Sequence, residues 1–183
     1  NLSDVQENPS EGLLLRGAHG PIELLEEASV VDRELIRRCL DIIVSGQRMD
    51  LERFSDKDGS GIRSLSRYEE MDDYAYRVAG SVGEFWTEIC LEHAFEASAE
   101  MKEELMSSGV RFGKALQLIN ILRDIPEDLE IGRCYIPTDD LEKIGLSPDN
   151  LLHSGSIDIF RPLLDQYIAR AEGHLDEAVR YIG

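Results

Sequence analysis

Four polar side chains recur at helical spacing within the stretch 113–137, GKALQLINILRDIPEDLEIGRCYIP. Gln117, Asn120, Asp124 and then either Glu127 or Asp128 follow one another three or four residues apart, so a helix would place them on one face. Like charges at this spacing destabilise an ordinary helix by about 0.2–0.5 kcal/mol. A hard divalent cation removes that cost, because Mg²⁺ prefers carboxylate, amide and water oxygens and usually shares its shell with a phosphate. The spacing therefore predicts a magnesium-binding stripe.

Arginines flank these acids. Arg123 and Arg133 could each grip phosphate oxygens through a planar guanidinium. The alternative is a solvated acidic helix face, which is common for a bare pair of aspartates four residues apart; the amides and the arginines favour a site. Pro126 predicts a kink or a helix end near Ile125, because proline inside a helix removes a hydrogen bond. Which of the two following acids binds metal therefore stays open.

The opposite face of this helix is apolar, and we expect it to pack in a core. It carries Leu116, Ile119 and Leu122. Ahead of it, 96–105 reads as a helix or the tail of one, and the Ser-Ser-Gly run at 107–109 predicts a break before Val110.

Two motifs together resemble one known family. The segment LQLINILRDIPEDLEIGRCYIP is similar to the second aspartate-rich motif of the squalene and phytoene synthases, NxxRDxxED followed by GRxYxP. The segment YAYRVAGSVGEFW, residues 74–86, resembles the YxxxVAGxVG signature of the same family. The segments GEFW and IPEDL most resemble the corresponding sequences of bacterial squalene-synthase-like members.

The resemblance implies an all-α helical bundle of the class I terpene synthase type, here lacking its N-terminal helices. It implies Mg²⁺-dependent, head-to-head condensation of two farnesyl diphosphates to squalene through presqualene diphosphate. Phytoene, dehydrosqualene and hydroxysqualene-type synthases remain alternatives. The metal would be held by Asn120, Asp124 and Asp128 or Glu127, and released pyrophosphate would be neutralised by the two flanking arginines. NADPH would be needed if the product is squalene, although the sequence holds no nucleotide-binding fingerprint.

The resemblance also implies a pocket for the isoprenoid chain. It would be lined by Ala79, Gly80 and Gly83, with Tyr76 near the reacting carbons and Gln117 on the same side. From composition alone, these small residues favour tight helix packing. Arg77 stands where some relatives carry a tyrosine, so a role that rests on that tyrosine does not transfer. The resemblance further implies that the expected loop 129–140 helps to close the site, which makes Tyr135 a catalytic candidate.

Charge excludes some classes of partner. The formal net charge of −18 argues against nucleic acid and against simple docking on anionic lipid. Three widely spaced cysteines predict reduced thiols and a cytoplasmic location. No apolar run of about 18 residues occurs, and no signal peptide is visible. Membrane association stays open, because the implied product is a lipid.

The chain reads as helical throughout, with 1–183 forming one partial isoprenoid synthase domain. Residues 1–20 read as a loop or a frayed tail. Ser66 and Glu69 predict a capping box. The break at 55–66 imitates a calcium loop, but Arg67 replaces the required glutamate, so we expect a solvated turn. Further helices are expected over 21–28, 32–54, 66–93 and 156–181, the last with Ile159, Leu163, Leu164, Tyr167, Ile168, Ala171, Leu175 and Val179 as its apolar face.

The family's first aspartate-rich motif is expected upstream of Asn1, and nothing in these residues replaces it. We therefore expect either missing upstream sequence or a non-catalytic relative that acts as a binding or assembly partner. The complete second motif favours catalysis, since a scaffold has no need of a like-charged stripe.

Overall fold

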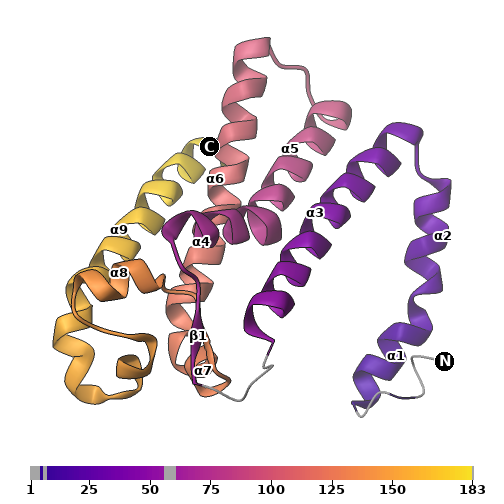
Figure 1. Cartoon of the computed structure of the whole chain (residues 1–183). Helices are drawn as coiled ribbons and strands as arrows, with labels where there is room; N and C mark the ends of the chain where they lie inside the picture. The colour runs from indigo at the N-terminus through magenta and orange to yellow at the C-terminus, as the bar shows by residue number, and fades with distance from the viewer. Residues whose placement is uncertain (1–4, 6–7, 56–60, 183) are drawn as a thin grey trace. The chain divides into compact units, whose positions relative to one another are not determined.

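The computed structural model describes residue 5, residues 8–55 and residues 61–182 (Figure 1). These fall into two compact units, 1–38 and 39–183. The first contains α1 (Pro9–Gly17), α2 (His19–Glu27) and the start of α3 (Val30–Phe54). Residues 1–20 were expected to be a loop or the frayed tail of a helix; the loop alternative was wrong for 9–17, where the side chain of Asn8 caps α1 by accepting the Ser10 N–H at 2.9 Å. The expectation of one domain stays a prediction.

The second unit is built almost entirely from helices, which confirms the all-α class. In its described part, the strands are a two-residue parallel pair in which Arg63 lies opposite Arg133. After the end of α3 the elements are β1 (Arg63–Ser64), α4 (Tyr68–Ala75), the π-helix η2 (Tyr76–Gly80), α5 (Ser81–His93), α6 (Ala99–Arg123), α7 (Ile125–Glu130), β2 (Arg133–Cys134), α8 (Thr138–Lys143), the 3₁₀ turns η3 (Pro148–Leu152) and η4 (Ser154–Ser156), and α9 (Ile157–Ile182). No helix in the described ranges is both long and apolar enough to cross a bilayer.

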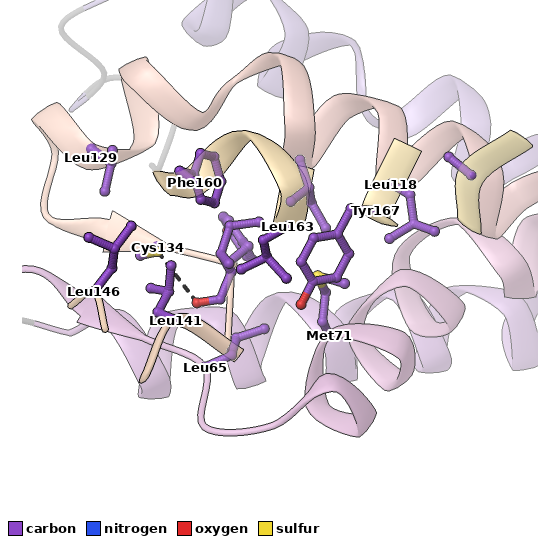
Figure 2. Close-up of a cluster of buried hydrophobic side chains, with 14 residues drawn as sticks. Leu65, Met71, Leu118, Leu129, Cys134, Leu141, Leu146, Phe160, Leu163 and Tyr167 are labelled. Atoms are coloured by element: carbon purple, nitrogen blue, oxygen red, sulfur yellow. Dashed lines mark hydrogen bonds between the residues drawn. The ribbon is translucent and has the colours of Figure 1, made fainter. Parts of the chain in front are cut away.

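Helix α6 organises this unit, running between α5 and α9 and packing against both (Figure 1). The main core lies around the C-terminal half of α6 and is contributed by α4, α6, α8 and α9 (Figure 2). Its fully buried members include Met71, Leu118, Leu141 and Tyr167. Helices α6 and α7, which carry the predicted metal ligands, are therefore fixed in this core.

Two expectations for α6 were wrong. The helix runs without a break through 107–109. Gly109 packs against α5, because a Cβ built there would lie 2.8 Å from the Gly83 carbonyl oxygen. The buried side of α6 is formed by Ala115, Leu118 and Ile121, whereas the predicted core residues Leu116 and Ile119 are 45% and 37% exposed; Leu122 does pack against the core cluster.

The expected helix 66–93 is present as three consecutive segments, α4, η2 and α5. It begins at Tyr68, and the acid that reaches back is Glu70 instead of Glu69: its carboxylate accepts the Ser66 N–H at 2.9 Å and pairs with Arg53. The π-helix inserts an extra residue into the turn at 76–80, a feature that is frequent at functional sites.

Helix α9 has the expected extent but a partly different apolar face. Leu163, Tyr167 and Ala171 are buried, while Ile159, Ile168 and Val179 are 50%, 40% and 71% exposed. The buried stripe also uses Phe160 and Ala178. Most of the imitation calcium loop, Asp56, Asp58 and Ser60, lies outside the described residues.

Candidate active site

The junction of α6 and α7 places the predicted metal ligands. Helix α6 ends at Arg123, Asp124 occupies the cap position between the helices, and Pro126 stands in the first turn of α7. This confirms the predicted helix end near Ile125. The chain nevertheless continues to turn in the same sense, because the Asp128 N–H donates to the Asp124 carbonyl at 2.9 Å. Asp124 and Asp128 therefore stay one turn apart.

The two aspartates differ in their electrostatic surroundings. The Arg123 guanidinium donates to both carboxylate oxygens of Asp124, at 2.6 and 2.7 Å, and this hydrogen bonding lowers the pKa of Asp124. Desolvation raises the pKa of Asp128, and the negative charges of Asp124 and Asp50 add to the rise, while Arg133 opposes it. The junction therefore holds more negative charge than its arginines balance, a state that a bound cation would relieve.

The structure also separates the two acids that the sequence left open. Asp128 is half-buried, whereas Glu127 is exposed. Gln117 and Asn120 are half-buried on the same stripe of α6. They lie three residues apart, and Asn120 lies four residues before Asp124. Of the two alternatives, Asp128 is the one whose side chain lies on the less exposed side of the α6–α7 junction.

The segment after α7 was expected to be a loop, but it is pinned to β1. Backbone N–H groups of Arg63 and Leu65 donate to the carbonyls of Gly132 and Cys134 at 2.9 and 3.2 Å, and the Thr138 N–H donates back to Leu65 at 2.8 Å. This pairing fixes Arg133 and Tyr135 beside the α6–α7 junction.

A carboxylate from a distant helix meets that segment. Asp50, near the end of α3, accepts a hydrogen bond from Arg133 Nη1 at 3.0 Å and another from the Tyr135 hydroxyl. The Tyr135 ring packs against Phe54 with centroids 5.0 Å apart and stacks on Tyr74 at the same distance. Burial and the Asp50 hydrogen bond raise the pKa of Tyr135, so the hydroxyl remains protonated.

Tyr74, and not Tyr76, lies in this cluster. Burial raises the pKa of Tyr74, whose hydroxyl also interacts with Tyr135 and senses the charges of Asp50 and Asp128. The hydroxyl of Tyr76 instead donates to Glu84 at 2.8 Å.

Sequence reasoning missed both Tyr74 and Asp50. Tyr74 is the first residue of the YxxxVAGxVG pattern, which was the available signal. For Asp50 the signal was weaker: a carboxylate one turn from Gly46 and Phe54, on the inward face of a helix, where unpaired acids are rare.

An apolar groove of about 380 Å³ adjoins the polar stripe on α6. It is lined by Val78, Ala79, Val82, Gly83, Trp86, Phe112, Gly113, Leu116 and Tyr181. Gly113, which lines the groove, is followed by Gln117, Asn120 and Asp124 at intervals of four, three and four, so the stripe begins one helical turn beyond this part of the groove. From Gly113 to Asp124 the helix rises about 16 Å, at 1.5 Å per residue.

Small residues in the VAGSVG segment serve helix packing as well as the groove. A Cβ on Gly83 would lie 1.9 Å from the Gly109 carbonyl oxygen, and one on Gly113 would lie 2.1 Å from that of Ala79. Gly80 is buried, and a Cβ there would meet Tyr76 at 3.1 Å. Ala79 and Gly83 line the groove as predicted, whereas Gly80 packs between helices.

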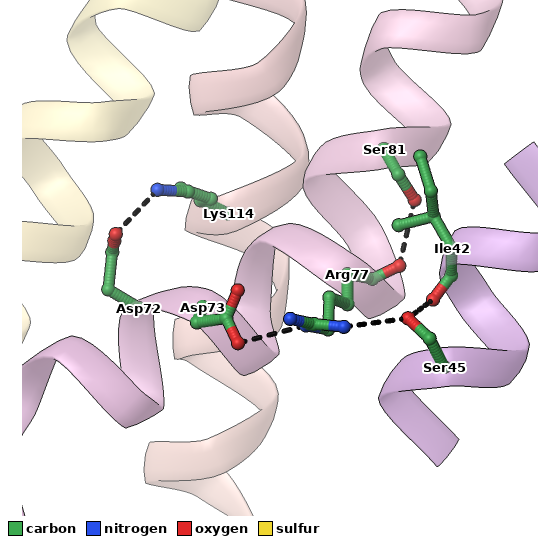
Figure 3. A network of polar contacts seen from close by, with 7 residues as sticks. All are labelled: Ile42, Ser45, Asp72, Asp73, Arg77, Ser81 and Lys114. Carbon is green, nitrogen blue, oxygen red and sulfur yellow. Dashed lines mark hydrogen bonds and ion pairs between the residues drawn. The ribbon is translucent and has the colours of Figure 1, made fainter. Parts of the chain in front are cut away.

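Arg77, the residue that departs from some relatives, takes part in a separate network on the α3 side of η2 (Figure 3). Its guanidinium donates to Asp73 and to the Ser45 hydroxyl, both at 2.9 Å. Arg77 therefore ties η2 to α3 and is not part of the Tyr74–Tyr135 cluster.

Comparison with known proteins decides the family. A model described as squalene/phytoene synthase matches residues 14–183. The chain belongs to the squalene/phytoene synthase family. It is 36% identical over 144 residues to the 15-cis-phytoene synthase of Synechocystis, covering 76% of this chain and 40% of that protein. It is 33% identical over 173 residues to the chloroplastic phytoene synthase 1 of Arabidopsis thaliana, covering 90% and 37%. The chain thus spans less than half the length of these relatives.

Solved structures support the same fold. The squalene synthase HpnC from Alicyclobacillus acidocaldarius superposes with a TM-score of 0.61 at 24% identity, covering 79% of this chain and 48% of that one. A dehydrosqualene synthase in complex with ligand gives a TM-score of 0.62 at 23% identity, with coverages of 79% and 45%. The predicted terpene synthase fold is therefore confirmed for this chain.

Family membership raises the question of whether the site fits a divalent metal. Among the described residues, no three acidic, histidine or cysteine side chains already converge as ligands. The donor chemistry nevertheless fits Mg²⁺, because the stripe offers amide and carboxylate oxygens. Desolvation and, after it, the negative charge of Asp124 raise the pKa of Asp128, and a bound cation would oppose that rise. Arg123 occupies one lone pair on each Asp124 oxygen, so a metal ligand bond from Asp124 would use the remaining lone pairs or follow release of Arg123.

Proposed function

We propose that this protein condenses two prenyl diphosphates head to head. The proposal is supported by helix α6, which carries the groove-lining residues Gly113 and Leu116 and, beginning one turn after Gly113, the polar residues Gln117 and Asn120, with Asp124 at its end. A prenyl diphosphate has the same two-part character, a long apolar chain ending in a strongly anionic group. The groove suits the chain, and the α6–α7 junction suits the diphosphate.

Each side chain has a definable task in this proposal. Asn120, Asp124 and Asp128 would hold Mg²⁺, which supplies Lewis-acid assistance to departure of the diphosphate when it is bound. Arg123 and Arg133 bind diphosphate oxygens; Arg123 is 65% exposed and free to turn from Asp124 towards the anion. Val82, Trp86 and Leu116 line the groove and would cover the allylic chain once it is bound, which would protect a cation from early capture by water.

We propose that Tyr74 and Tyr135, which lie beside the α6–α7 junction, act near the reacting carbons; the role expected for Tyr76 stays a prediction. Their stacked rings present π-faces that favour a nearby positive charge. Their raised pKa values keep both hydroxyls protonated at neutral pH, so neither phenol competes as an anionic nucleophile for the cation.

Two substrate lengths are in competition. The motif sequences favour farnesyl diphosphate as the substrate and squalene as the product, with NADPH as the hydride donor. The phytoene synthases among the relatives favour a longer prenyl diphosphate and a C40 product formed without NADPH. Because either product is a lipid, the proposal includes peripheral contact with a membrane during release.

The test uses protein from the complete gene, incubated with Mg²⁺ and either C15 or C20 prenyl diphosphate, with and without NADPH. We expect a solvent-extractable hydrocarbon whose mass identifies the substrate length. Asp124→Asn should abolish it. Asp73→Asn is the matched control, because both carboxylates pair with an arginine and are about equally exposed, at 40% and 43%. A folded wild-type protein that yields neither product nor pyrophosphate would refute the proposal and favour a binding or assembly role.

A further inference from the structure

Asp50 is a carboxylate on α3 whose two partners both come from the β2 segment. Its side chain is 12% exposed. One oxygen accepts from Arg133 Nη1 at 3.0 Å, and the other accepts from the Tyr135 hydroxyl. Two residues 83 and 85 positions away in the sequence are therefore held by one side chain.

Phe54, one turn after Asp50, contacts the same two residues. Its ring meets the Tyr135 ring edge-on, with centroids 5.0 Å apart, and Arg133 Cζ lies 5.9 Å from its centroid. On the other side, Tyr135 stacks on Tyr74 with an interplanar angle of 22°. The last turns of α3 thus form a clamp in which one residue supplies charge and the other supplies an apolar wall.

The backbone of the clamped segment is held by its pairing with β1, whereas the Arg133 guanidinium and the Tyr135 hydroxyl are held by Asp50. Strand β2 is two residues long and follows Gly132, which has a φ of +77°. Arg133 bonds to Asp50 and lines the same small pocket as Asp128, whose pKa its charge lowers. Without Asp50, Arg133 would be drawn to Asp128 and would neutralise one of the candidate metal ligands.

We propose that Asp50 is a positioning residue that directs the Arg133 guanidinium and the Tyr135 hydroxyl towards the diphosphate site and keeps Arg133 from closing onto Asp128. This inference rests on the proposed function. Asp50 touches no substrate in this scheme and acts through its two partners. Its loss should therefore weaken recognition of the diphosphate by more than its effect on folding explains.

The chain contains a structural twin that serves as a control. Asp140 accepts from the Tyr167 hydroxyl at 2.5 Å and from Lys143 Nζ at 2.7 Å, and its side chain is 16% exposed. It has the same chemistry as Asp50, one tyrosine and one cation on a mostly buried carboxylate. It joins α8 to α9 and contacts neither the groove nor the stripe.

The experiment compares Asp50→Asn with Asp140→Asn in protein from the complete gene. Calorimetry measures pyrophosphate affinity in the presence of Mg²⁺. Steady-state kinetics with prenyl diphosphate give KM and kcat, and thermal unfolding gives stability. We expect both variants to lose stability to a similar degree. Asp50→Asn should weaken pyrophosphate binding on the order of 10-fold, as loss of a supporting hydrogen bond around a bound group typically does, and Asp140→Asn should leave it unchanged.

A double variant tests whether Asp50 acts through Arg133. In an Arg133→Gln background, adding Asp50→Asn should cause little further loss of pyrophosphate affinity, because the positioned group is already gone. Equal pyrophosphate affinity in wild type and Asp50→Asn, or fully additive losses in the double variant, would overturn the proposal. If Asp50→Asn does not fold, Asp50→Glu takes its place, with Asp140→Glu as the control and the same expected contrast. Wild-type protein that binds no pyrophosphate would instead show that the proposed function has failed, and the inference with it.

Discussion

The contact between α5 and α6 gives a quantitative prediction for Gly83→Ala. A Cβ at Gly83 would lie 1.9 Å from the Gly109 carbonyl oxygen, where ordinary contact begins at 3.4 Å. The obstacle is backbone on both sides, so no flexible side chain can move away. The two helices would have to separate by about 1.5 Å at this point.

The expected cost follows from two opposing terms. Overpacking of a well-packed interior destabilises by about 1–3 kcal/mol, and a backbone obstacle places this site at the upper end. Alanine is favoured over glycine in a helix by about 1 kcal/mol, which offsets part of that cost. We therefore expect Gly83→Ala to lower the free energy of unfolding by about 2 kcal/mol and the melting temperature by about 4–8 °C.

Urea denaturation followed by circular dichroism measures this change. Gly173→Ala is the control, because Gly173 lies within α9 and a Cβ there meets nothing within 4 Å. The same substitution should stabilise the protein there by about 1 kcal/mol. Equal effects at Gly83 and Gly173, or stabilisation at both, would refute the reasoning that backbone contact requires glycine at the α5–α6 crossing.

Three further predictions concern ionisable groups. Burial and neighbouring charge raise the pKa of Asp128, so its ionisation opposes folding; Asp128→Asn should raise the urea midpoint at pH 7, and the gain should vanish below pH about 4, where the unfolded carboxyl is also protonated. Desolvation and the charge of Arg111 lower the pKa of His174, so wild-type stability should fall as pH drops below about 6.5, and His174→Gln should lose less over the same range in thermal melts. Burial raises the pKa of Cys134 to about 12, so a thiol reagent should modify half-buried Cys90 well before Cys134, which should react only on unfolding; early modification of Cys134 would contradict its burial.

The long helices could be predicted from the sequence because their apolar periodicity is a local property. Helix α3 was expected over 32–54 and is found at Val30–Phe54. The Ser-Ser-Gly run at 107–109 misled the prediction for α6, since the role of Gly109 is decided by Gly83, which lies in another helix. A local breaker signal cannot reveal that a glycine is required for close contact between two backbones.

The candidate site likewise contains residues that local spacing could predict and residues that only long-range contacts bring together. Asn120, Asp124 and Asp128 lie within one helix and the turn that follows, so spacing alone was enough to place them together. Asp50 joins them through hydrogen bonds to residues more than 80 positions away, and no local pattern contains that pairing. Tyr74 is the first residue of the quoted motif, whereas the resemblance was taken to imply a role for Tyr76, which stays a prediction. The π-helix that begins at Tyr76 changes the register of that turn, which the sequence pattern did not reveal.

Stability and site geometry are coupled in this chain because they depend on the same face of α6. Gly113 brings α6 within contact distance of the Ala79 backbone and also lines the groove. The polar stripe begins one turn later, so its direction relative to the groove is set by how closely α6 approaches η2 and α5. A substitution that forces these helices apart should therefore widen the groove and also shift Gln117 and Asn120 relative to Tyr74. We therefore expect glycine at these crossings to set the distance between the groove and the polar stripe.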